Sequence, residues 1–116
     1  DIDMERIGLI GASMGGFHAF ALTATDLRVR LAVACAVPTV WSHEVVLAPA
    51  DYAQGIGNRP FCMLMGRHDE MCSEANAREL FAHIEGPNTK LIFYDSGHTL
   101  PVEFFADAID FVAARL

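Results

Sequence analysis

Ser13 lies in the segment of this chain whose residue types and spacing most clearly suggest chemistry. The segment, residues 11–16, reads GASMGG and fits the pattern G-x-S-x-G, in which a serine occupies the apex of a tight turn between a strand and a helix. Such a turn leaves the hydroxyl exposed, and the small residues around it let the backbone pass close by. A serine held in this way is a candidate nucleophile for acyl transfer.

Two further polar residues follow other predicted strands. Asp69 ends the segment MGRHD (residues 65–69), and His98 lies in the segment GHTLP (residues 97–101). In open parallel sheets, functional residues gather beyond the carboxyl ends of the strands. A serine, an acid and a histidine are therefore expected at one edge of the sheet, in the chain order Ser, Asp, His.

Other residues could fill parts of this arrangement. Glu70 is adjacent to Asp69 but one position off the motif, and Asp95 could act as the acid only if its loop folds back. The glycine-rich turn lacks the G-K-[ST] ending of a phosphate loop and the G-x-G-x-x-G spacing of a dinucleotide site. No paired C-x-x-C or H-x-x-x-H spacing supports a metal site from Cys62, His68 and Cys72, so we predict neither a metal nor a cofactor.

The elements that must position these residues alternate along the chain. Continuous apolar runs predict strands buried on both faces, and 3.6-residue apolar stripes predict helices between them. We expect strands at residues 6–10, 31–37, 61–65 and 90–94, and helices at 14–25, from the N-cap Ser73 to 84, and from Pro101 to the end. This order predicts an α/β fold with a mostly parallel sheet of about four strands. Residues 39–59 are less regular and should form a short helix and loops over the end of the sheet.

Composition limits the class of protein. The 116 residues predict a single domain, 1–116, and 53% hydrophobic residues predict a folded core. A net charge of -7 argues against nucleic acid or an anionic membrane as a partner. No apolar run is long enough to span a membrane, and the acidic N-terminus does not resemble a secretory leader. The odd number of cysteines, three, then favours reduced thiols and a cytoplasmic location.

The three motifs GASMGG, MGRHD and GHTLP, in this order, resemble those of the α/β-hydrolases. The resemblance covers essentially the whole chain but only the C-terminal half of that fold, and it is closest to the esterase, dienelactone-hydrolase and acyl-peptidase branches. It implies Ser13 as nucleophile, His98 as general base and Asp69 as the acid that orients the imidazole. It also implies the Met14 backbone N–H as an oxyanion donor. Trp41 and His68 are candidates for the substrate pocket.

The function predicted on this basis is a serine hydrolase that cleaves an ester or related acyl bond of a small-molecule substrate. Thioester or peptide hydrolysis by the same residues stays open. Only six residues precede Ile7, so the loop that normally supplies a second oxyanion donor is expected to be absent. The strand at residues 6–10 would then be an open edge. We expect a homo-oligomer or a partner chain there, and a non-catalytic or truncated chain acting through such association is the alternative.

Overall fold

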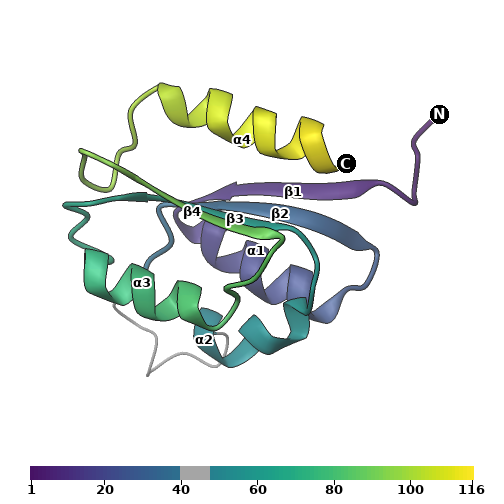
Figure 1. Cartoon of the computed structure of the whole chain (residues 1–116), viewed down its shortest axis with the longest axis horizontal. Helices are drawn as coiled ribbons and strands as arrows, with labels where there is room; N and C mark the ends of the chain where they lie inside the picture. The colour runs from purple at the N-terminus through teal and green to yellow at the C-terminus, as the bar shows by residue number, and fades with distance from the viewer. Residues whose placement is uncertain (40–47) are drawn as a thin grey trace.

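The computed structural model describes residues 1–39 and 48–116, and its framework is one parallel sheet (Figure 1). Neighbouring strands pair in parallel in the spatial order β1-β2-β3-β4. The strands are β1 (Ile7–Ala12), β2 (Val29–Cys35), β3 (Phe61–Gly66) and β4 (Thr89–Tyr94). The predicted α/β class and four parallel strands are confirmed.

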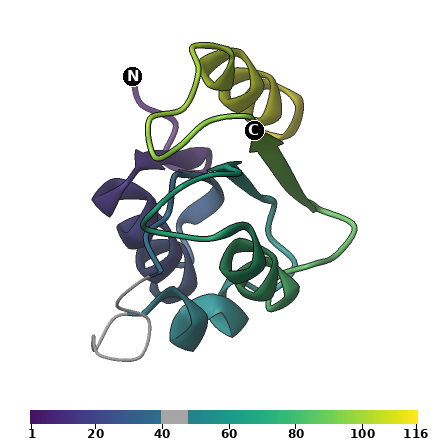
Figure 2. The ribbon, with the colours of Figure 1, turned by 90° about the vertical axis from the view of Figure 1, so that its left-hand side faces the viewer.

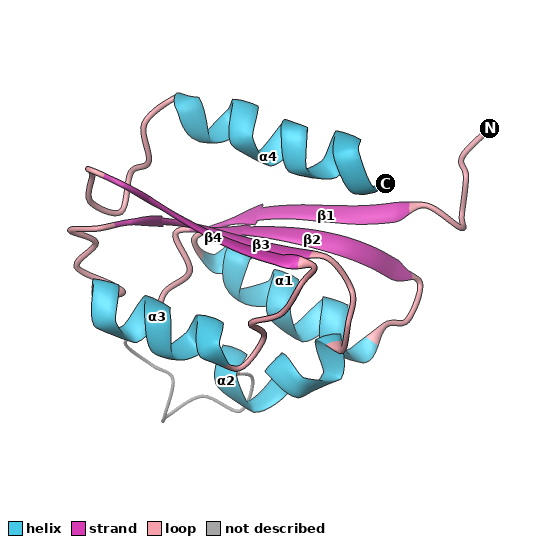
Figure 3. Cartoon of the chain, in the orientation of Figure 1, coloured by secondary structure: helices cyan, strands magenta, loops and turns pink. Residues whose placement is uncertain are grey.

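Helices cover both faces of this sheet (Figure 3). Of the described helices, α4 (Glu103–Arg115) covers one face, and α1 (Met14–Thr25), α2 (Pro49–Tyr52) and α3 (Glu74–Ala82) cover the other. A short 3-10 turn (Ala53–Ile56) follows α2, so the short helix predicted between residues 39 and 59 is present. Trp41 lies outside the described residues.

Some predicted boundaries were wrong by one or two residues. The second strand begins at Val29, because Val29 pairs with Ile7, and it ends before Ala36, whose φ of 47° breaks the extended backbone. The last helix begins at Glu103 rather than at Pro101, because a tighter turn, with Phe104 donating to the Pro101 carbonyl, comes first.

The core has two parts, one on each face of the two central strands. Phe20 of α1 packs against Phe61 on one face, with ring centroids 4.5 Å apart. On the other face, Phe111 of α4 packs over Cys62 and its neighbours. β2 and β3 are covered on both sides. Apart from the exposed Arg30 near the start of β2, their sequences are therefore apolar without interruption, which is why the runs were recognisable as buried strands.

The three cysteines are buried and unpaired. Burial raises the pKa of the Cys35 thiol to about 11 and that of the Cys62 thiol to about 12. Both therefore stay protonated at neutral pH and act as small apolar side chains, as expected from their sequence positions. No helix within the described residues has the length and hydropathy that crossing a membrane would require.

Candidate active site

Ser13 occupies the turn between β1 and α1 in a strained conformation. Its φ of 55° and ψ of -117° lie in a region of backbone conformation where residues other than glycine are rare. The backbone hydrogen bonds of Ser13 over-determine this geometry, because its N–H donates to the Cys35 carbonyl at 2.9 Å and its C=O accepts from the Phe17 N–H at 3.0 Å. These two bonds attach the turn at Ser13, the elbow between β1 and α1, to the end of β2 on one side and to the first turn of α1 on the other.

Close backbone approach explains two of the glycines in the motif. A Cβ on Gly11 would collide with the backbone of Gly15, and a Cβ on Gly16 would lie 2.7 Å from the Cys35 carbonyl oxygen. Gly15 itself has open space where its Cβ would be. The sharp turn therefore depends on the missing side chains of Gly11 and Gly16.

The structure brings Ser13, His98 and Asp69 into one line of hydrogen bonds. The distance from Ser13 Oγ to His98 Nε2 is 2.8 Å, and that from His98 Nδ1 to Asp69 Oδ2 is 2.9 Å. A carboxylate only accepts, so Nδ1 carries the proton and Nε2 is left to accept from the serine hydroxyl. The three residues come from the carboxyl ends of β1, β3 and β4, the end that Figure 2 turns toward the viewer.

Asp69 is held more firmly than its partner. Its carboxyl group is fully buried, whereas the His98 side chain is 31% exposed. The second carboxylate oxygen, Oδ1, accepts from the Met71 backbone N–H at 2.8 Å. This local turn was not anticipated, although an aspartate that bonds the N–H two residues on is a recognisable Asx turn. It leaves Oδ2 facing the imidazole.

The loops that carry Asp69 and His98 lie against each other. The His68 N–H donates to the Ser96 carbonyl at 2.9 Å, and the Arg67 N–H donates to the Tyr94 carbonyl at 2.8 Å. Gly66 makes this contact possible, because a Cβ there would collide with the Gly97 carbonyl. The sequence showed both glycines but not that they meet.

The rival acids lie elsewhere. Asp95 Oδ1 is 2.7 Å from His68 Nε2, and both side chains are largely exposed. Glu70 is also exposed to solvent. His68, a candidate for the substrate pocket, thus bonds Asp95 on the exposed side of the loop that carries Asp69. The other candidate, Trp41, lies outside the described residues. Over residues 1–39 and 48–116, no three His, Cys, Asp or Glu side chains gather as a metal site would require.

Met14, the oxyanion candidate, is the first residue of α1. Its N–H has no acceptor within the helix, because the first N–H groups of any helix lack one. The positive end of the helix dipole is at the same place and favours negative charge there. Met14 is 69% exposed, so its side chain is not part of the core.

Known proteins resemble this chain in structure rather than in sequence. No protein-family model matches the sequence, and no curated protein matches it. An esterase of Pyrococcus furiosus superposes with a TM-score of 0.83 at 18% identity, over 95% of this chain and 54% of its own. A cold-adapted esterase from an Arctic intertidal metagenomic library gives 0.81 at 26% identity, over 96% and 50%.

A peptidase also resembles the chain in fold. The acylaminoacyl peptidase of Pyrococcus horikoshii superposes with a TM-score of 0.84 at 14% identity, over 98% of this chain and 24% of its own. The chain therefore spans about half the length of the esterases that it resembles. Over that half, with its parallel four-stranded sheet, the chain has the α/β-hydrolase fold.

Proposed function

We propose that this chain carries the catalytic residues of a serine hydrolase that cleaves an ester or a related acyl bond. The observation that supports this most directly is the pair of hydrogen bonds from Ser13 to His98 and from His98 to Asp69. The strained serine adds support, because backbone strain of this kind clusters at functional sites. The structural resemblance to esterases and to a peptidase supports a hydrolase in general.

In the first half of the proposed reaction, Ser13 Oγ attacks the acyl carbon while His98 Nε2 takes the hydroxyl proton. The bond from carbon to the leaving group breaks as His98 returns that proton to the departing alkoxide, and the acyl group stays on Ser13. Asp69 holds the imidazole in the tautomer that accepts the proton and stabilises the imidazolium. Its burial strengthens that interaction, because little water screens it.

In the second half, His98 takes a proton from water, and the resulting hydroxide attacks the acyl carbon. The ester bond to Ser13 breaks, the serine regains its proton from His98, and a carboxylic acid is released. The Met14 N–H would donate to the oxyanion formed in each half. A second donor is needed for full effect, since loss of one donor typically costs about 10²–10³ in turnover.

The proposed substrate is a small acyl compound, and ester, thioester and peptide bonds differ here only in the leaving group. Trp41, which follows β2 in the sequence, and His68, in the loop after β3, are proposed to contact it. The three free thiols support a reducing compartment such as the cytoplasm.

Labelling with a fluorophosphonate tests the proposal. The folded chain should be labelled at Ser13, Ser13→Ala should lose the label, and His98→Ala should label far more slowly. Ser96→Ala is the matched control, because Ser96 precedes His98 by two residues and its hydroxyl donates to the Gly97 carbonyl, outside the Ser13–His98–Asp69 line. Folded, unlabelled wild-type chain would contradict a catalytic role.

A second candidate function, association with another chain, is favoured by the β1 edge. Within the described residues β1 pairs only with β2, and Ile10 is 55% exposed although it lies in an apolar strand. A second copy or a partner chain could add to this edge, along residues 6–10. If association alone were the function, labelling would fail while Ile10→Lys would weaken complex formation.

A further inference from the structure

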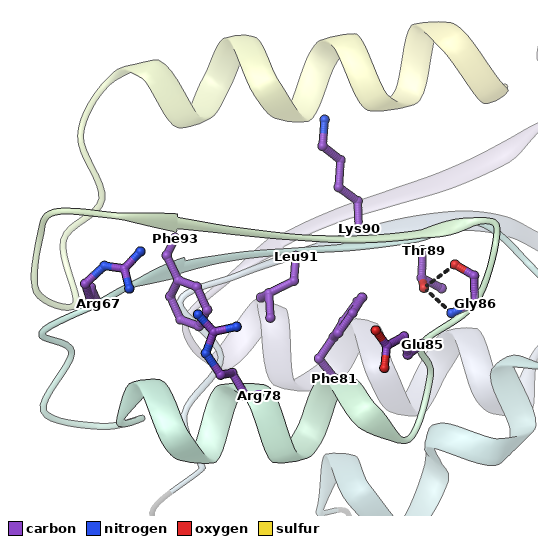
Figure 4. A pocket seen from close by; sticks show the side chains of 9 residues that line it. All are labelled: Arg67, Arg78, Phe81, Glu85, Gly86, Thr89, Lys90, Leu91 and Phe93. Atoms are coloured by element: carbon purple, nitrogen blue, oxygen red, sulfur yellow. Dashed lines mark hydrogen bonds between the residues drawn. The ribbon is translucent and has the colours of Figure 1, made fainter.

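The other edge of the sheet, β4, borders an open groove that the proposed reaction does not use. The groove has a volume of about 650 Å³ and lies between β4 and α3 (Figure 4). Leu91 and Phe81 form its middle, Arg67, Arg78 and Phe93 lie toward one end, and Glu85 lies toward the other. The apolar side chains along it are only partly buried.

Alternation along β4 shows which backbone groups lie at the free edge of the sheet, beside this groove. The Asn88 and Tyr94 carbonyls accept from the Phe61 and Arg67 N–H groups, so even-numbered residues bond toward β3. Odd-numbered residues point the other way, and within the described residues no strand lies beyond β4. The N–H and C=O groups of Leu91 and Phe93 are therefore directed away from β3, along the open edge of the sheet. An added strand would meet them there.

The charges at the two ends are opposite in sign. Arg67 and Arg78 share one oxygen of Glu74, which leaves a net positive charge at the Phe93 end. Both guanidinium carbons also lie over the Phe93 ring, 5.1 and 4.8 Å from its centroid, so they are held in place. At the opposite end, Glu85 is exposed.

From this arrangement we propose that a second copy of the chain pairs antiparallel along β4, about a two-fold axis at Leu91. An antiparallel copy reverses the groove, so the arginine end of each copy meets Glu85 of the other. Leu91 lies opposite itself as a hydrogen-bonded pair, and the Phe93 N–H faces the Thr89 carbonyl of the second copy. Leu91 and Phe81 lie at the axis between the two charged ends (Figure 4). The groove is thus complementary to itself, whereas the chain as a whole, at -7, repels its copies.

Charge reversal tests this interface. Light scattering after size exclusion should find a dimer of the wild-type chain, and Arg78→Glu and Glu85→Arg should each shift it to monomer. Mixing the two variants should restore a dimer that contains one of each, because each mixed contact then pairs opposite charges. Glu79→Arg, a reversal on the same helix outside the groove, is the matched control and should stay dimeric.

Hydrogen exchange gives a readout that needs no variant. The Leu91 and Phe93 amides should exchange at least tenfold more slowly in the dimer than in the Arg78→Glu monomer, whereas amides of β2 should not change. A wild-type monomer at all concentrations would overturn the proposal. An oligomer that persists in both charge-reversal variants would also overturn it, because that oligomer would form through β1 or another surface. Protection of the Leu91 amide only on addition of an unrelated peptide would overturn it as well.

Discussion

The Gly97 carbonyl oxygen occupies the space that a Cβ on Gly66 would need. Two loops far apart in sequence therefore meet backbone to backbone, one carrying Asp69 and the other His98. The bond from His98 to Asp69 depends on this contact, although neither glycine takes part in it.

Gly66→Ala should separate the two loops and lower ester hydrolysis while the chain stays folded. A displacement of about 1 Å at reacting groups can cost roughly 10² in rate. We expect a loss of that order in kcat, measured with an activated aryl ester, and an unchanged far-UV circular dichroism spectrum. Gly86→Ala is the control, since its Cβ would meet nothing closer than 4.0 Å. Full activity of Gly66→Ala would show that the loops can move apart harmlessly.

Replacing the glycines around Ser13 by alanine should change the stability of the fold in opposite directions at Gly11 and Gly15. Gly11→Ala should destabilise the chain by about 1–3 kcal/mol, because the new methyl group overlaps the Gly15 backbone. Gly15→Ala should stabilise it by about 0.5–1 kcal/mol, because Gly15 is helical with open space around it. Urea denaturation measures both, and equal effects of the two would contradict this steric account.

Ser13 itself should be a site where glycine is more stabilising than alanine. The φ of 55° strains any residue with a Cβ, and relief of such strain is worth about 1 kcal/mol or more. Ser13→Gly should therefore unfold at a higher denaturant concentration than Ser13→Ala, although both lose the hydroxyl. At Ala19, in the helical interior of α1, the same comparison should favour alanine.

Asp69→Asn should lower turnover by about 10⁴ at neutral pH with little change in fold. The Met71 N–H selects the side-chain oxygen, so the new NH₂ group would face His98 Nδ1. That nitrogen would then have to accept, Nε2 would carry the proton, and it could not receive one from Ser13. Steady-state rates with an aryl ester give the loss. Asp95→Asn, which alters only the exposed bond to His68, should keep most of the activity.

Alkaline pH should weaken the fold through the buried thiols. Their pKa values are raised from 9.0 to about 11 for Cys35 and about 12 for Cys62, so their stabilising contribution is complete below pH 9. Above pH 9 the unfolded chain loses these protons first, and stability falls by about 1.4 kcal/mol per pH unit for each thiol until the folded-state pKa is reached. Urea midpoints between pH 8 and about pH 11 measure the slope. Cys62→Ala should reduce it, and an unchanged slope would contradict this origin.

Local patterns in the sequence determined most of the fold. The apolar runs at β2 and β3 were recognisable because both faces of these strands are buried, so that from Leu31 onward in β2, and along β3, the exposed polar residues of a half-buried strand are missing. The boundaries that failed, at Val29 and Glu103, depend on strand register and on a turn after Pro101, which are contacts between distant or irregular segments.

The sequence by itself also determined which residue types lie at the strand ends: Ser13, Asp69 and His98 were all identified from motif and order. Only the tertiary structure decided their partners. It pairs Asp69 with His98 and Asp95 with His68, because Gly66 and the Met71 N–H fix how the two loops meet. It alone also placed the arginines and Glu85 at opposite ends of the β4 groove, since a charged residue has no position relative to a strand edge until the segment that carries it is packed against that strand.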